Sequence, residues 1–487
     1  MSTMDIILCH DTEDVYTPAE AGMDSVPKRL AEIYSAEGIK ANFMVIAQRA
    51  EVLKQRGRDD VIAAMREHCI GVHTRWDGQP YDAVAVLGLP WEDGLEAVRQ
   101  LEREAYSIVA SVFDTQPVCL SAHAFNAAPQ MHVVARELGL PFNYGYAAAP
   151  PLYSLSRYCG NLNFPYFTDY TGTTLPYFEG FDDVLSFEPA FTKHLELFDQ
   201  HIDACLQAKQ PVMLVHPCHP FKIYNLDWVD FYVSPNGKLI PPEEWPKRRG
   251  PGRRTPAQVE LALRNFQRLA HYIARHPHLN VITIPEAVAK YGAVPASITR
   301  LDLFGAAQQA CDSHEVSLDQ RFSPAELVLA WAEALLAFAQ SGHLPDAVAR
   351  NNDCLGPLED PLITPEPPRD VNWGAVLDAA SALLSFASAK GHLPANLQVA
   401  GSTAGLGSVY HLLARSYLSV CKDGTAPETL DLWRFDRQPR IGVSIGKQYA
   451  DLAESQLVPP NLDVSSLYRQ GKLQTWTLAP CWQARAG

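Results

Sequence analysis

The sequence lacks the marks of a secreted or membrane-spanning protein. Its first residues, MSTMDIILCHDTED, contain no basic stretch followed by a long apolar one, so we expect no secretory signal. No apolar run is long enough to predict a helix that crosses a bilayer. The 10 cysteines are scattered without a CxxC pair, which is typical of buried, reduced thiols rather than of a disulfide framework. These features predict a cytoplasmic protein.

Positive charge is also scarce. The 487 residues carry 40 Lys and Arg against 55 Asp and Glu, a formal net charge of −15. Because phosphate contacts need clustered basic side chains, this balance argues against a general nucleic-acid binder. The apolar content of 47% is that of a globular protein. The length allows about three domains, or one large α/β barrel with an appendage.

Short apolar runs alternate with helical patterns over residues 1–297. Buried strands that alternate with helices predict a parallel sheet with right-handed crossovers, and their number favours a closed or nearly closed barrel. Thr255, Pro256 and Gln258 form a capping box that marks the start of one helix. The predicted strands are residues 6–9, 42–46, 70–73, 118–120, 142–144, 212–215 and 281–284.

The character of the chain changes at about residue 298, where Ala- and Leu-rich helical patterns replace the strands. We therefore predict an all-helical domain over residues 298–487. It contains an internal repeat, because the tetrad Gly-His-Leu-Pro occurs at 342–345 and again at 391–394 after similar apolar segments. Each tetrad lies where a helix should end, at a glycine followed by proline. The helical domain also offers a surface for a homo-oligomer.

Acids and histidines follow four of the predicted strands. They occupy residues 10–14, 73–77, 121–123 and 216–219. One acidic cluster after a strand is usually a solvated turn, but in a barrel the carboxyl ends of the strands meet and form the active site. Carboxylates with imidazoles suit a divalent metal such as Zn²⁺, which would activate water and polarise a carbonyl group. A second carboxylate could then act as a base and a histidine as an acid.

In this order the motifs resemble the polysaccharide deacetylase group (NodB homology, carbohydrate esterase family 4) over residues 4–292. The acidic motif of that family is matched at residues 11–14, its His-Ser/Thr-x-x-His motif at 73–77 and its Leu-x-His motif at 214–216. The resemblance implies a distorted (β/α) barrel of NodB type and a divalent metal, Zn²⁺ first and Mn²⁺ or Co²⁺ as alternatives. It also implies hydrolysis of the N-acetyl group of a sugar, or of another non-peptide C–N bond.

The resemblance implies roles for particular residues. Asp11 would be the general base and His216 the general acid. The metal ligands would come from four side chains: Glu13, Asp14, His73 and Asp77. Contacts to a glycan or small-molecule substrate are expected from Trp76, His123, His219, Tyr166 and Tyr170; the last two belong to an aromatic-rich stretch that could stack on a sugar ring.

The sequence departs from the family pattern at two places. Asp77 stands where the family has its second metal-binding histidine, which would shift the preference toward a harder metal such as Mn²⁺, or signal loss of the metal. The Arg-x-Pro motif of the family is replaced by Ser-Ala-His, so the arginine that would orient the base is missing. His123 could take a replacement role as a ligand or an acid.

Three functions stay open at this point. The first is a metal-dependent amide hydrolase of the deacetylase type, and the second is a metal-independent hydrolase of a small or cyclic amide. The third is a catalytically inactive barrel that binds glycan or acts as a scaffold. The repeat at 298–487 has a fainter likeness to pseudomurein-binding repeats, which implies an appendage that binds a wall glycan or a peptide.

Overall fold

A computed structural model describes residues 3–481 apart from several short segments. The segments outside the description are residues 124–125, 149–154, 166–176, 230–234, 239, 241–243, 245–251, 317–320, 364–369, 435–438 and 440–443. Every structural statement below concerns the described residues.

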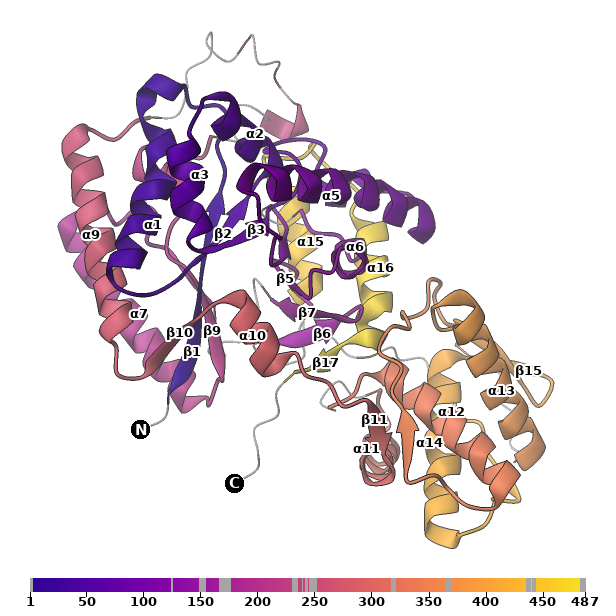
Figure 1. Ribbon diagram of the computed structural model, residues 1–487. Coiled ribbons are helices and arrows are strands. Elements are labelled where there is room, and N and C mark those ends of the chain that lie inside the picture. The colour runs from indigo at the N-terminus through magenta and orange to yellow at the C-terminus, as the bar shows by residue number, and fades with distance from the viewer. Residues whose placement is uncertain are drawn as a thin grey trace.

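A curled, mostly parallel sheet of 11 strands forms the centre of the protein (Figure 1). Its order is β17-β6-β7-β5-β4-β3-β2-β1-β9-β8, with β10 paired to β1. Among the described strands of this sheet, the β6–β7 and β17–β6 pairs are antiparallel and the others are parallel. The predicted distorted (β/α) barrel is confirmed, but within the described chain its end strands β8 and β17 do not pair, so the closed form that the number of strands favoured is not found there. The strands are β1 (Met4–Thr12), β2 (Asn42–Val45), β3 (Cys69–Val72), β4 (Leu120–Ser121), β5 (Phe142–Tyr144), β6 (Ser156–Tyr158), β7 (Asn161–Phe164), β8 (Tyr177–Glu179), β9 (Val212–His216), β10 (Leu279–Ile282) and β17 (Ala479–Pro480).

The first strand, β1, is the central element of this sheet. All nine of its residues are buried, as expected for a strand covered on both faces. Its first half pairs with β9 and β10, and its second half, residues 9–12, pairs with β2. The carboxyl end of β1 therefore lies between the carboxyl ends of β2 and β9, its neighbours in the sheet.

Helices cover the outside of the barrel (Figure 1). The helix that starts at Thr255 has the predicted capping box, with Gln258 bonded back to the cap. No helix in the described part of the chain is long and apolar enough to cross a membrane. The barrel helices are α1 (Val26–Ala36), α2 (Ala47–Gln55), α3 (Asp59–Arg66), α4 (Asp82–Ala85), α5 (Trp91–Phe113), α6 (Gln130–Glu137), α7 (Glu188–Gln207), α9 (Pro256–Arg275) and α10 (Ile284–Tyr291).

The second region is mainly helical and has its own hydrophobic core around Trp331. Three short antiparallel strand pairs, which the sequence patterns did not reveal, join its helices. As predicted, α12 and α13 end at Gly342 and Gly391, both in the left-handed conformation. A third helix, α14, ends in the same way at Gly424 and is followed by Pro427. The elements are β11 (Ser297–Thr299), α11 (Arg300–Ser313), α12 (Pro324–Ser341), β12 (Ala347–Ala349), β13 (Val371–Asn372), α13 (Trp373–Lys390), β14 (Asn396–Val399), β15 (Ser402–Gly405), α14 (Leu406–Asp423) and β16 (Thr429–Leu430).

The last part of the chain returns to the barrel (Figure 1, yellow). Strand β17 pairs with β6 of the central sheet. Helices α15 (Ser444–Glu454) and α16 (Ser465–Leu473) add Ile445, Tyr449 and Leu467 to the core of the barrel. The boundary predicted at residue 297 stays a prediction, because α15, α16 and β17 pack with the barrel whereas Trp476 joins the core of the helical region.

Candidate metal centre and active site

Acids and histidines that are far apart in sequence meet at the carboxyl ends of β1, β3, β4 and β9. These strands are close neighbours in the sheet order, so their carboxyl ends open on the same side. The side chains brought together are all buried, with exposed fractions from 0% to 4%: Asp11, Glu13, His73, His123, His216 and His219. They form two overlapping groups.

The first group consists of Glu13, His73 and His123. The Oε1 atom of Glu13 lies 3.0 Å from Nε2 of His73 and 3.7 Å from Nε2 of His123. The two imidazole rings are stacked, with their centroids 5.4 Å apart. One ligand atom from each residue lies within 4.8 Å of the others, which is close enough for all three to hold one metal ion.

A hydrogen bond behind His73 orients it as a ligand. The hydroxyl of Ser121 lies 2.7 Å from Nδ1 of His73 and donates to the carbonyl of Val72 at 3.3 Å, so it holds the imidazole ring from behind. Nε2 of His73 is thereby directed at Oε1 of Glu13, 3.0 Å away, where a divalent ion would replace the proton of this hydrogen bond. Metal-binding histidines are commonly held in this way by a hydrogen bond on their other ring nitrogen.

The carboxylate of Glu13 is buried and ionised, which suits it to bind a cation. Its Oε2 atom is buried and has no hydrogen-bond partner among the described residues. Burial alone would raise its pKa, but His123, His73 and His219 together hold the pKa of Glu13 well below its ordinary value. An unsatisfied buried carboxylate is costly. Two imidazoles and one carboxylate form a catalytic zinc donor set that leaves a fourth position open, so the residues present fit the implied metal.

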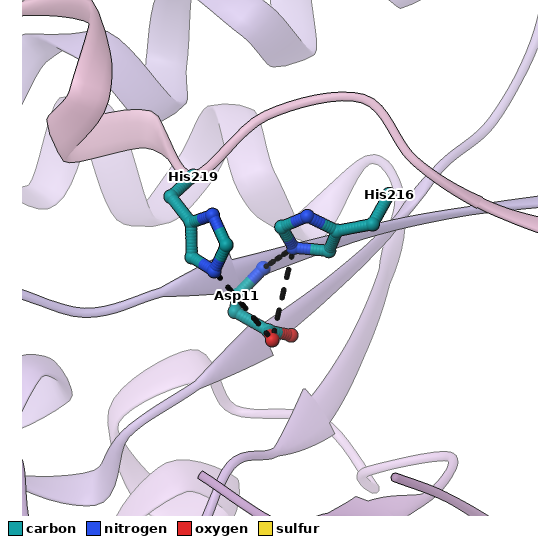
Figure 2. A group of neighbouring side chains, drawn as sticks. All are labelled: Asp11, His216 and His219. Atoms are coloured by element: carbon teal, nitrogen blue, oxygen red, sulfur yellow. Dashed lines mark hydrogen bonds and ion pairs between the residues drawn. The ribbon is translucent and has the colours of Figure 1, made fainter. Parts of the chain in front are cut away.

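The second group is centred on Asp11 (Figure 2). The hydroxyl of Tyr144 donates to Oδ1 of Asp11. The other oxygen, Oδ2, lies 3.6 Å from Nε2 of His73, 3.7 Å from Nε2 of His216 and 4.0 Å from Nε2 of His219. Asp11 therefore links the two groups and presents one carboxylate oxygen to the ligand nitrogen of His73.

The two histidines beside Asp11 are held differently. The backbone N–H of Asp11 donates to Nε2 of His216 at 3.0 Å. His219 bonds through Nδ1 to Oδ2 of Asp182 at 2.8 Å, and its backbone N–H donates to Oδ1 of the same carboxylate at 2.7 Å. Burial opposes the charge of His219, but Asp182 raises its pKa to about 10. Burial and the neighbouring His219 lower the pKa of His216.

The structure does not place Asp14 in any group of candidate ligands among the described residues. Its carboxylate accepts the backbone N–H groups of Tyr16 at 3.0 Å and Thr17 at 2.8 Å, and the side-chain amide of Asn225 at 3.1 Å. Asp14 itself has a positive φ of 68°. Its carboxylate is therefore engaged in shaping the loop after β1.

The other predicted residues lie outside the two groups. Asp77 accepts the backbone N–H of Val15 at 3.0 Å through Oδ2, so it too holds the loop after β1. Trp76 is covered by the guanidinium of Arg75, whose central carbon lies 3.8 Å from the ring centroid. Tyr166 and Tyr170 fall outside the described residues.

Sequence reasoning did not single out Tyr144 and Asp182 as site residues. Tyr144 ends a predicted strand, and its position at a strand end is the one feature of the sequence that could have indicated it as a site residue. Asp182 follows β8, which the sequence patterns did not predict, so nothing in the sequence connected it with His219. In contrast, the sequence does indicate His123 as a replacement ligand or acid, and the structure brings it to Glu13.

Comparison with known proteins finds similarity among solved structures. No family model matches the chain, and no curated protein is similar to it in sequence. PuuE allantoinase is 14% identical, with a TM-score of 0.36, over 60% of this chain and 92% of that one. A T48 deacetylase solved with substrate is 14% identical, with a TM-score of 0.27, over 59% and 92%.

A family 4 acetyl xylan esterase from Clostridium thermocellum, solved in complex with a cobalt ion, is also similar. It is 12% identical, with a TM-score of 0.26, over 60% of this chain and 93% of that one. These proteins include members of the group that the sequence motifs resemble. At such identities and TM-scores the likeness carries no weight for function, which has to be judged from the site itself.

Proposed function

We propose that this protein is a metal-dependent hydrolase that cleaves a non-peptide amide bond, with an N-acetylated sugar or a related small amide as substrate. One observation carries the proposal. A buried carboxylate and two buried imidazoles, Glu13, His73 and His123, converge on one point, and a second carboxylate, Asp11, stands 3.6 Å from His73. The substrate class follows the resemblance of the sequence motifs.

Glu13, His73 and His123 are the proposed ligands. A divalent ion held there, Zn²⁺ first and Mn²⁺ or Co²⁺ as alternatives, would polarise the acyl carbonyl and lower the pKa of water. The ion also suits the charge of the site. The carboxylates of Asp11, Glu13 and Asp182 are buried, and a cation held beside them would offset their negative charge.

Asp11 is the proposed base. Tyr144 holds its Oδ1 atom, so Oδ2 is directed toward the ligand nitrogen of His73. From this position Oδ2 can accept the proton of a water molecule that attacks the acyl carbon. Nε2 of His216 and Nε2 of His219 lie 3.7 Å and 4.0 Å from the same Oδ2 atom, where a proton can be returned to the departing amine.

The metal part of the proposal is tested by stoichiometry and affinity. The purified protein would be analysed by mass spectrometry for metal content, stripped with a chelator and titrated calorimetrically with Zn²⁺, Mn²⁺ and Co²⁺. We expect one ion per chain, and a large loss of affinity in Glu13→Gln and His73→Ala. His343→Ala, which removes an exposed histidine in the helical region, is the matched control and should bind like the wild type.

The catalytic part is tested by acetate release from N-acetylated amino sugars and small amides. We expect turnover that is abolished by the chelator, restored by the metal and lost in Asp11→Asn. Turnover that persists in the chelated protein would support the metal-independent alternative. If Glu13→Gln and His73→Ala bind the metal as tightly as the wild type does, the assignment of the ligands is overturned.

A further inference from the structure

Both histidines drawn in Figure 2 approach Oδ2 of Asp11, but His216 is the one of the two that also contacts the backbone N–H of Asp11. Nε2 of His216 accepts the backbone N–H of Asp11 at 3.0 Å. That nitrogen therefore uses its lone pair and cannot also carry a proton, because two N–H groups would then point at each other. The only proton of a neutral His216 is on Nδ1, which is buried and has no hydrogen-bond partner among the described residues.

His219 has the opposite arrangement. Its Nδ1–H is donated to Asp182, and the same carboxylate accepts its backbone N–H, so both oxygens of Asp182 fix one residue. The ring also packs edge-on against Trp228, with the centroids 4.6 Å apart. These contacts direct Nε2 toward Oδ2 of Asp11, 4.0 Å away, which leaves that nitrogen available to carry a proton into the site.

We propose that His219, oriented by Asp182, is the residue that protonates the leaving amine, and that His216 is a positioning residue that holds the backbone of Asp11. This inference rests on the proposed amide hydrolysis. It departs from the expectation that the histidine of the Leu-x-His motif is the acid.

The step balances with water as the only co-reactant. Asp11 takes one proton from the attacking water, whose oxygen bonds to the acyl carbon. When the C–N bond breaks, its electron pair stays on nitrogen, which takes the proton from Nε2 of His219. The proton on Asp11 then passes across the 4.0 Å gap to Nε2 of His219, directly or through a water molecule. The products are the carboxylic acid and the amine.

The leaving group provides the test. An amine must be protonated to depart, whereas the phenolate of 4-nitrophenyl acetate leaves without a proton. For the metal-loaded protein we expect His219→Gln to lower kcat on an N-acetylated amino sugar by about 10²-fold or more, and to change the aryl ester rate far less. Asp182→Asn should show the same selectivity to a smaller degree, because the ring of His219 loses its orientation.

His216→Gln is the comparison that separates donation from positioning. It should slow amide and aryl ester hydrolysis by similar factors, because Asp11 serves both reactions. His343→Gln is the matched control and should change neither rate. The proposal is overturned if the loss in His219→Gln is equal for both substrates, or if His216→Gln is the variant with the leaving-group selectivity.

A second measurement does not depend on turnover. The measurement is the NMR spectrum of the wild type labelled with ¹⁵N-histidine. We expect His216 to carry its proton on Nδ1, and His219 to show an Nδ1–H that is hydrogen-bonded to a carboxylate. The signal of this hydrogen bond should be lost in Asp182→Asn. A proton on Nε2 of His216 would overturn the inference. If the wild type binds metal and cleaves the ester but fails these two tests, the donor assignment fails while the proposed function stands.

Discussion

The hydroxyl of Tyr144 donates a hydrogen bond to Oδ1 of Asp11, and this contact joins the end of β5 to β1 inside the barrel. Both residues are almost fully buried. The bond uses one carboxylate oxygen and leaves the other facing His73. It fixes the orientation of the Asp11 carboxylate, the residue proposed as the base.

Tyr144→Phe is the direct test of this contact. A hydrogen bond to a buried charged group contributes about 1.5–3 kcal/mol, so we expect the free energy of unfolding to fall by that order. A misplaced catalytic group can cost about 10²-fold in rate, and we expect kcat to fall by up to that factor. Urea unfolding and acetate release measure the two effects. Tyr468→Phe, at an exposed tyrosine, is the control, and equal effects in both variants would contradict the assigned role.

His123 and Asp77 give opposite predictions for metal affinity. His123 faces Glu13, so His123→Ala should weaken Zn²⁺ binding by more than the roughly 100-fold typical of an outer contact. Asp77 accepts the backbone N–H of Val15, which the carbonyl of an asparagine can also do. Asp77→Asn should therefore keep its metal affinity within a few-fold of the wild type. Calorimetric titration with Zn²⁺ measures both affinities. If Asp77→Asn lost more affinity than His123→Ala, Asp77 would again be the expected ligand.

A pair of buried carboxyl groups predicts how stability depends on pH. Asp82 on α4 and Glu102 on α5 are 2% and 0% exposed. Burial raises the pKa of Asp82 to about 7, and burial together with Asp82 raises the pKa of Glu102 as well. In the unfolded chain both groups lose their protons near pH 4. The folded state therefore binds more protons between about pH 4 and 7, and stability should fall as the pH rises through this range.

Glu102→Gln removes one of the two titrating groups. We expect its fall in stability from pH 5 to pH 8 to be smaller than that of the wild type, measured by urea unfolding at both values. Glu92→Gln, at an exposed position of the same helix, should follow the wild type. A steeper fall in Glu102→Gln would show that the pair does not hold protons in the folded state.

The returning C-terminal segment supports the loop that follows Tyr144. Gln448 on α15 is 1% exposed, accepts the N–H of Ala147 at 2.8 Å and donates to the carbonyl of Gly145 at 3.4 Å. Gln448→Ala leaves both backbone groups without these partners, which costs about 1–3 kcal/mol for each buried group. We expect lower stability and faster hydrogen exchange at Ala147. Gln398→Ala, at an exposed glutamine, is the control, and unchanged exchange in Gln448→Ala would show that α15 does not support the loop.

Much of the barrel could be predicted because its signals are local. The apolar runs that became β1, β2, β3 and β9, and the capping box at Thr255, depend on neighbours within a few residues. The short strand pairs of the second region escaped prediction, because these strands are partly exposed and lack the buried apolar run that marks β2 and β3. The pairing of β17 with β6 joins segments some 320 residues apart, and no local pattern encodes it.

The sequence by itself determined which chemistry is available: carboxylates and imidazoles at the ends of successive strands. Only the tertiary structure decided their partners, because a carboxylate that caps a loop and one that faces a histidine have the same composition and spacing. Asp14 bonds to its own loop through a local turn, whereas Glu13, one residue earlier, faces His73 and His123 from other strands. Asp182 and His219, 37 residues apart, are paired by the packing of the loops after β8 and β9, and this contact selects His219 rather than His216 as the proposed proton donor.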